Sequence, residues 1–172
     1  MMQLILGGAR SGKSRLAEQT AKESGLSVVY IATAQALDEE MQQRIQHHQQ
    51  QRPSHWQLCE EPICLADQLL QLDQENQLIL VDCLTLWLIN LLLAEDTALQ
   101  QQQTEKLLKV LPQLKSDIIL VSNETGLGVV PMGEISRRFV DEAGRLHQAL
   151  GQLADKVVFC VAGFPMLLKG AK

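Results

Sequence analysis

A glycine-rich segment near the start of the chain combines residue types that suit phosphate chemistry. It follows a short apolar run at 4–6, precedes a segment of helical character and has the spacing G-x-x-x-x-G-K-S. Its residues are Gly7, Gly8, Ala9, Arg10, Ser11, Gly12, Lys13 and Ser14. Glycines let backbone N–H groups approach phosphate oxygens, and a helix that starts here adds the positive end of its dipole. Lys13 would reach the β- and γ-phosphates and Ser14 would offer its hydroxyl to Mg²⁺. The segment, a P-loop, therefore predicts a nucleoside triphosphate site rather than a chance glycine turn.

A carboxylate at the end of a second apolar run is the next candidate. Residues 78–81 have the pattern of a buried strand, and Asp82 follows them. In P-loop folds an aspartate at the carboxyl end of a neighbouring strand orients Mg²⁺ or its waters beside the serine hydroxyl. The alternative is that Asp82 caps a helix that begins at Leu84. We favour the metal role, shared by Ser14 and Asp82. Asn123 and Glu124 end another predicted strand and should face the same edge, with no role assigned to them.

A histidine between two arginines offers a possible nucleophile. If residues 37–52 form a helix, Arg44, His48 and Arg52 lie one above another, because they are spaced i, i+4, i+8. Guanidinium groups bind phosphate oxygens, and an imidazole between them could attack phosphorus. His47 falls on another face of that helix. A histidine among apolar neighbours is more often a core or interface residue, so the spacing alone leaves both roles for His48 open.

The elements that must position these candidate residues are strands that alternate with helices. Short apolar runs occur at 3–6, 27–32, 78–81, 117–121 and 157–161. Helical segments are expected at 13–24, 37–52, 62–72, 84–95, 97–114 and 133–154. This alternation indicates a mainly parallel sheet covered on both faces, with 164–169 returning as an antiparallel edge strand. We expect an α/β fold, a P-loop NTPase-like three-layer sandwich, in a single domain at 1–172.

Composition excludes several classes of protein. The chain has 172 residues, of which 46% are hydrophobic and 20% charged, as in an ordinary globular domain. Its net charge of −5, without a long basic run, argues against nucleic acid as a partner. The apolar stretch at 84–94 is too short to span a membrane, and with no signal peptide apparent we expect a cytoplasmic protein. A helix there would be apolar around most of its circumference, so it must be buried in the core or against another chain. The four cysteines form no C-x-x-C pair, and no second pair completes a metal site with Cys59 and Cys64. We expect Cys83 and Cys160, in or beside predicted core strands, to behave as small hydrophobic residues.

Motifs over nearly the whole chain resemble the bifunctional adenosylcobinamide kinase/adenosylcobinamide-phosphate guanylyltransferase family of cobalamin biosynthesis. Many families share the P-loop, whereas two blocks are specific: R-I-x-x-H-x-x-x-R-P-x-x-W at 44–56 and S-N-E-T-G-L-G-V-V-P at 122–131. Y-I-A-T at 30–33, V-D-C-L-T-L-W at 81–87 and R-F-x-D-x-x-G at 138–144 support them. The chain departs from the family pattern at Leu58, Val140 and His147, where threonine, arginine and asparagine are usual.

The resemblance implies roles for particular residues. His48 would become guanylylated by GTP and pass GMP to adenosylcobinamide phosphate, so His48 and Lys13 are the catalytic candidates. The GTP site would comprise the P-loop, Ala32, Thr33, Ala34, Gln49, Gln50, Gln51, Arg52, Glu60 and Asp82. We add Arg44 to this site because of its spacing from His48 and Arg52. Mg²⁺ would be the cofactor, and GTP and ATP would be the nucleotide substrates. The other substrates would be adenosylcobinamide and adenosylcobinamide phosphate. The protein would assemble as a homotrimer.

Two other interpretations stay open at this point. The chain could be a different small-molecule or nucleotide kinase, in which His48 is structural. It could also be a nucleotide-gated regulatory or assembly protein with little catalysis, although we see no coiled coil or interaction tail that would support this. The sequence leaves open whether ATP or GTP is the phosphoryl donor and whether both activities are present.

Overall fold

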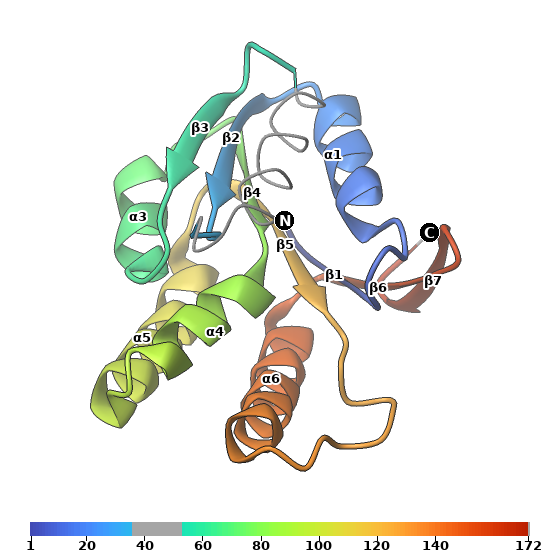
Figure 1. Cartoon of the computed structure of the whole chain (residues 1–172). Coiled ribbons are helices and arrows are strands. Elements are labelled where there is room, and N and C mark those ends of the chain that lie inside the picture. The colour runs from blue at the N-terminus through green and yellow to red at the C-terminus, as the bar shows by residue number, and fades with distance from the viewer. Residues whose placement is uncertain (36–52, 172) are drawn as a thin grey trace.

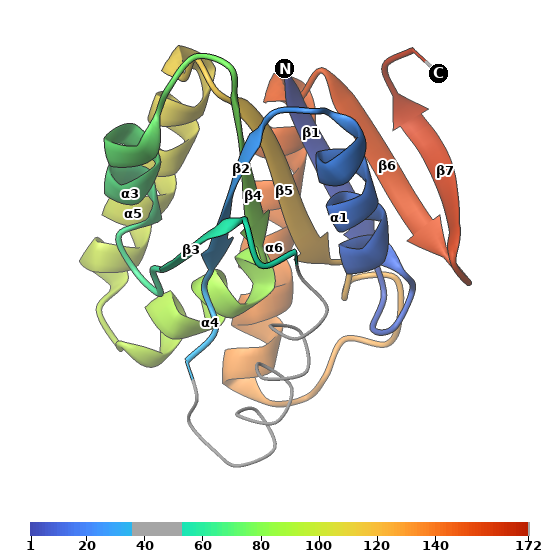
Figure 2. The same cartoon turned by 90° about the horizontal axis from the view of Figure 1, so that it is seen from above.

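The computed structural model describes residues 1–35 and 53–171, and its sheet lies between two layers of helices (Figure 1, Figure 2). The strands are β1 (Met2–Gly7), β2 (Ser27–Ala32), β3 (Gln57–Glu60), β4 (Gln77–Asp82), β5 (Asp117–Asn123), β6 (Lys156–Val161) and β7 (Phe164–Lys169). The helices are α1 (Lys13–Glu23), α3 (Leu65–Leu72), α4 (Leu84–Leu93), α5 (Thr97–Val110) and α6 (Glu134–Leu153), with a 3₁₀ turn η1 (Leu111–Gln113).

The sheet confirms the predicted parallel architecture and its edge strand. Its order is β3-β2-β4-β5-β1-β6-β7, and every neighbouring pair is parallel except β6 and β7, which are antiparallel. The parallel strands place all their carboxyl ends at one edge of the sheet, where functional loops of such folds gather. One expectation needs correction, because the strand that ends at Asp82 is not the neighbour of the P-loop strand. β5 lies between β1 and β4.

Three local differences from the predicted elements have identifiable causes. The prediction missed β3, whose residues are mostly exposed and show no apolar run. The third predicted helix starts at Leu65 instead of 62, because Glu61 Oε1 accepts hydrogen bonds from the backbone N–H groups of Ile63 (2.9 Å) and Cys64 (2.6 Å) and holds a turn there. The helix predicted to reach 114 ends at Val110, and Pro112 lies in the 3₁₀ turn that follows.

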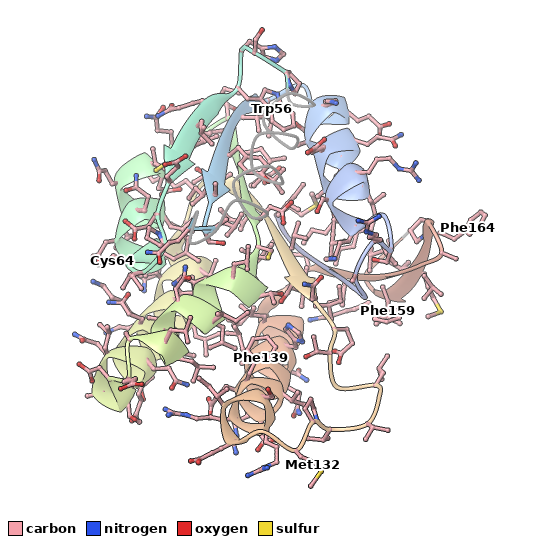
Figure 3. The ribbon with its side chains drawn as sticks, viewed as in Figure 1. Trp56, Cys64, Met132, Phe139, Phe159 and Phe164 are labelled. Carbon is pink, nitrogen blue, oxygen red and sulfur yellow. The ribbon has the colours of Figure 1, made fainter. Side chains whose placement is uncertain are left out.

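Two apolar clusters fill the space on either side of the sheet. One joins the strands to α3, α4, α5 and α6. The other joins them to α1 and includes Trp56, which precedes β3 (Figure 3). Trp87 and Leu91 of α4 are fully buried, so this apolar helix belongs to the core of the chain itself. None of the described helices has the length and apolar character needed to cross a membrane.

The predicted helix at 37–52 lies outside the described residues. The four cysteines are free, and Cys83 and Cys160 are buried, as expected for residues in or beside core strands. Burial, together with the charge of Asp82, raises the pKa of the Cys83 thiol to about 11, so this group stays a neutral thiol at physiological pH.

Candidate nucleotide site

The P-loop connects the end of β1 to the start of α1 and needs glycine at two positions. A Cβ at Gly7 would lie 2.7 Å from the carbonyl oxygen of Cys160, which leaves no room for a side chain. Gly12 is the N-cap of α1 and has a φ of 93°, in the left-handed region that favours glycine. These constraints explain why the chain turns so tightly here and directs the first N–H groups of α1 toward the sheet edge.

The charged and hydroxyl groups of the P-loop take distinct places. Lys13 is 9% exposed, and its Nζ donates a hydrogen bond to the Gly8 carbonyl at 3.1 Å, so the ammonium lies across the loop. Ser14 is half-buried in the first turn of α1, whereas Ala9 and Arg10 are exposed at the loop tip. Ser11 Oγ is buried and makes no hydrogen bond with any described residue. The loop therefore offers a cation, a hydroxyl and backbone donors, the groups that a triphosphate requires.

The sheet register brings three further predicted residues into one row. Ala32 of β2 pairs with Glu60 of β3 on one side and with Asp82 of β4 on the other. Ala34 follows closely and is half-buried. The Thr33 hydroxyl donates to the Cys83 carbonyl (2.6 Å) and accepts from the Cys83 N–H (3.1 Å), so this side chain ties β2 to the segment after β4.

The surroundings of Asp82 favour a ligand role over a capping role. The N-cap of α4 is Cys83, and no side chain caps this helix, so the capping alternative is wrong. The half-buried carboxylate of Asp82 makes no hydrogen bond or ion pair with a described residue. Mg²⁺ in nucleotide sites takes one or two protein oxygens and completes its shell with phosphates and water, a donor set that Ser14 and Asp82 fit. No cluster of three or more His, Cys, Asp or Glu side chains occurs at 1–35 and 53–171, and such a magnesium site does not need one.

The end of β5 lies against the P-loop, as expected from the sequence. Asn123 pairs with Gly7 in the register, and the Glu124 N–H donates to the Gly7 carbonyl at 3.0 Å. On the other side, the Asn123 N–H donates to Thr85 Oγ1 at 2.7 Å. Asn123 and Glu124 therefore sit between the P-loop and the segment that follows Asp82.

The sequence did not point to a buried polar network at this edge. Ser122 Oγ lies 2.8 Å from His147 Nε2 of α6 and 3.3 Å from Thr85 Oγ1 of α4. Burial lowers the pKa of His147, and the charge of Glu124, whose Oε2 is 3.5 Å from Nδ1, partly opposes this. The only hint was that His147 departs from the family pattern. Of the other two departures, Leu58 is exposed on β3 and Val140 is half-buried on α6.

A loop with exposed apolar side chains leads from this network to α6. Between β5 and α6, Val129 is 96% and Met132 is 94% exposed, and Leu127 is also exposed. In Figure 3, Met132 lies on the side of the molecule away from α1. The loop begins where β5 ends, at the carboxyl edge of the sheet. Arg44, His48, Gln49, Gln50, Gln51 and Arg52 lie outside the described residues, and their predicted roles stay predictions.

Two solved structures resemble this architecture. A protein from Pyrococcus horikoshii OT3 has a TM-score of 0.58 at 11% identity, covering 99% of this chain and 87% of that one. The RadB recombinase has a TM-score of 0.54 at 18% identity, covering 92% of this chain and 73% of that one. At these identities the likeness concerns the fold, and it confirms the P-loop NTPase-like sandwich.

Sequence comparisons are more specific. The family model for cobinamide kinase / cobinamide phosphate guanyltransferase (CobU) matches residues 3–168. The chain is 60% identical over 170 residues to the bifunctional adenosylcobalamin biosynthesis protein CobP of Pseudomonas aeruginosa, covering 99% of this chain and 98% of that protein. It is 38% identical over 183 residues to the bifunctional adenosylcobalamin biosynthesis protein CobU of Escherichia coli K12, covering 98% of this chain and 100% of that protein. The chain therefore belongs to the cobinamide kinase / cobinamide phosphate guanyltransferase family.

Proposed function

We propose that the protein phosphorylates adenosylcobinamide and then transfers GMP from GTP to the phosphate it has made. The observation that carries this proposal is the arrangement of the carboxyl edge, where the P-loop, Asp82 and Asn123 end the strands β1, β4 and β5 and where the apolar loop at 125–133 begins. The first three supply a triphosphate site, and the loop adds surface for a large second substrate. Family membership supports the identity of that substrate.

In the phosphoryl-transfer step, this chain's contribution is positioning and charge. Lys13 and the N–H groups at the start of α1 would hold the phosphates in line with the acceptor hydroxyl of adenosylcobinamide. Ser14 and Asp82 would hold Mg²⁺, which neutralises charge on the phosphate oxygens when it is bound. ATP or GTP would serve as phosphoryl donor, since the P-loop binds the triphosphate they share.

In the guanylyl-transfer step, His48 would act as a nucleophile. A neutral imidazole nitrogen attacks the α-phosphorus of GTP, the bond to the bridging oxygen breaks, and pyrophosphate leaves with that electron pair. The phosphoramidate then yields GMP to adenosylcobinamide phosphate, giving adenosylcobinamide-GDP. Arg44 and Arg52 would stabilise the phosphate charge, and Ala32, Thr33, Ala34, the glutamines at 49–51 and Glu60 would line the nucleotide. We further propose a cytoplasmic homotrimer that acts on small molecules and not on nucleic acid.

Mass analysis after incubation with GTP and Mg²⁺ tests this function. We expect a GMP adduct on the protein that disappears when adenosylcobinamide phosphate is added. As a phosphoramidate it should be acid-labile and stable in base. The His48→Ala variant should lose the adduct and retain phosphorylation of adenosylcobinamide, whereas His47→Ala, its matched control, should keep both. Active protein without an adduct, or an adduct mapped to His47, would contradict the guanylyl-transfer mechanism and favour a kinase in which His48 is structural.

A further inference from the structure

Glu124 places a carboxylate at the centre of the nucleotide edge without an assigned task. Its backbone N–H is bonded to the carbonyl of Gly7, the first residue of the P-loop, at 3.0 Å. Its side chain is 20% exposed, so the carboxylate is largely covered but reachable. β4, which ends at Asp82, lies on the other side of β5. A carboxylate repels the phosphate groups that the P-loop binds, so proton acceptance from a substrate suits this position better than phosphate binding.

One hydrogen bond and one longer contact with a histidine orient this carboxylate. Glu124 Oε1 accepts a hydrogen bond from the Gly126 N–H at 2.5 Å. The other oxygen, Oε2, lies 3.5 Å from Nδ1 of the buried His147, an atom that makes no shorter hydrogen bond with a described residue. Because a carboxylate only accepts, the proton of a neutral His147 ring is best placed on Nδ1, facing Glu124. Burial lowers the pKa of His147 and so favours that neutral ring.

The assignment of the proton to Nδ1 agrees with the hydrogen bonds on the other side of the ring. His147 Nε2 then accepts from the Ser122 hydroxyl at 2.8 Å. Ser122 Oγ accepts from the Thr85 hydroxyl at 3.3 Å, and Thr85 Oγ1 accepts from the Asn123 N–H at 2.7 Å. The network thus joins α4, β5 and α6 and holds the imidazole at Nε2. A ring held on one side presents its N–H to Glu124 in a defined direction.

We propose that Glu124 is the general base of the phosphoryl-transfer half-reaction and that His147 is its positioning residue. The inference rests on the proposed function above. The O–H bond of the acceptor hydroxyl breaks and its proton moves to Glu124, while the oxygen electron pair forms the bond to the γ-phosphorus. The bond from that phosphorus to the β–γ bridging oxygen breaks, and the nucleoside diphosphate leaves with the electron pair. Glu124 then releases the proton to solvent.

The second half-reaction provides an internal control for this role. Its acceptor is a phosphate oxygen, which is already anionic at neutral pH and has no proton that must be removed. A general base is therefore needed in the kinase step and not in the transfer of GMP. Loss of Glu124 should separate the two activities, whereas loss of a residue that binds the nucleotide should impair both.

The two half-reactions of Glu124→Gln, measured separately, test the proposal. We expect kcat for phosphorylation of adenosylcobinamide to fall about 10²–10⁴-fold, the usual contribution of a positioned base. The GMP adduct and its transfer to adenosylcobinamide phosphate should form at the wild-type rate. Glu134→Gln, which removes an exposed carboxylate at the start of α6, is the matched control and should leave both activities unchanged. In Glu124→Ala, added formate should restore part of the kinase activity by replacing the carboxylate.

Other outcomes overturn the assignment in distinguishable ways. Wild-type kinase activity in Glu124→Gln would exclude a general base at this position. An equal loss of both half-reactions, or a raised Mg²⁺ requirement in both, would assign Glu124 to the nucleotide or the metal. Failure of the wild-type protein to phosphorylate adenosylcobinamide would instead contradict the proposed function itself.

The positioning role of His147 has its own readout. His147→Ala should lower kcat for phosphorylation without changing KM for either substrate, since the ring orients the base and touches no substrate. His147→Asn, whose amide N–H can still donate toward Glu124, should recover part of the lost kcat. A His147→Ala protein with reduced thermal stability and unchanged kcat would show that the residue is only structural. If the His147→Ala protein does not fold, the His147→Asn variant still tests the positioning role and the Glu124 variants still test the general base.

Discussion

The backbone N–H of Gly163 donates a hydrogen bond to the carbonyl of Ser11 at 2.9 Å, which ties the turn between β6 and β7 to the P-loop. The two segments are 152 residues apart, and a Cβ at Gly12 would come within 3.2 Å of Gly163 Cα. The antiparallel edge hairpin therefore supports the loop that we propose binds the nucleotide, in addition to extending the sheet (Figure 1).

Replacement of Gly163 should weaken nucleotide binding through this support. Gly163 has a φ of 86°, so Gly163→Ala forces a side chain into the left-handed region at a cost of about 1 kcal/mol. We expect a lower melting temperature and a higher dissociation constant for GTP. Gly151→Ala, in α6 where a Cβ meets nothing within 4 Å, is the control and should leave nucleotide affinity unchanged. Equal GTP affinity in the folded Gly163→Ala and Gly151→Ala proteins would show that the hairpin does not support the loop.

Removal of the Lys13 ammonium should impair both half-reactions. The positive charge of Lys13 lies across the P-loop, and a preorganised charge at the phosphates contributes about 10²-fold or more to the rate. We expect Lys13→Ala to lower kcat/KM for adenosylcobinamide phosphorylation and for GMP transfer by at least this order. Lys22→Ala, in the last turn of the same helix and exposed, should have wild-type rates. Near-normal turnover of folded Lys13→Ala would contradict the P-loop assignment.

The metal dependence of the Asp82→Asn variant should show whether Asp82 binds Mg²⁺. Because Asp82 does not cap α4, Asp82→Asn removes no helix-capping hydrogen bond, and the melting temperature should stay close to that of the wild-type protein. The Mg²⁺ concentration for half-maximal activity should rise, since a neutral amide is a poorer ligand for this cation. A magnesium titration beside a thermal melt measures both effects. An unchanged magnesium requirement would remove Asp82 from the metal site.

His147 should make the folded protein less stable in mild acid. Burial holds the folded-state pKa of His147 below the ordinary pKa of an imidazole, so the unfolded chain binds more protons between these two values. The contribution of His147 to the free energy of unfolding therefore decreases as pH falls from the ordinary histidine pKa of about 6.5 toward the lower folded-state pKa. Denaturant titrations across this range should show a steeper loss for the wild-type protein than for His147→Asn, which cannot titrate. Parallel pH dependences of the two proteins would exclude this linkage.

Local patterns in the sequence predicted most of the elements and the principal candidate site. The P-loop, the apolar strand that ends at Asp82, and the edge strand at 164–169 each depend on residues that are close in sequence. The alternation of apolar strands with helices was sufficient to predict a mainly parallel α/β sandwich, because parallel strands that are covered on both faces have nearly continuous apolar sequences. The two specific sequence blocks were sufficient for the family.

Tertiary structure alone decided which of these elements meet. The spacing of β1, β4 and β5 in the sequence does not predict that β5 lies between the other two strands. Strand order depends on how each crossover connection packs on the sheet. The exposed strand β3 has no periodic signal and exists through its pairing with β2. The contact of His147 with Ser122 joins residues 25 positions apart on α6 and β5, and the Thr33 hydroxyl reaches Cys83 across 50 positions. Such contacts form because buried polar groups need partners, and only the packed chain determines which partners are within reach.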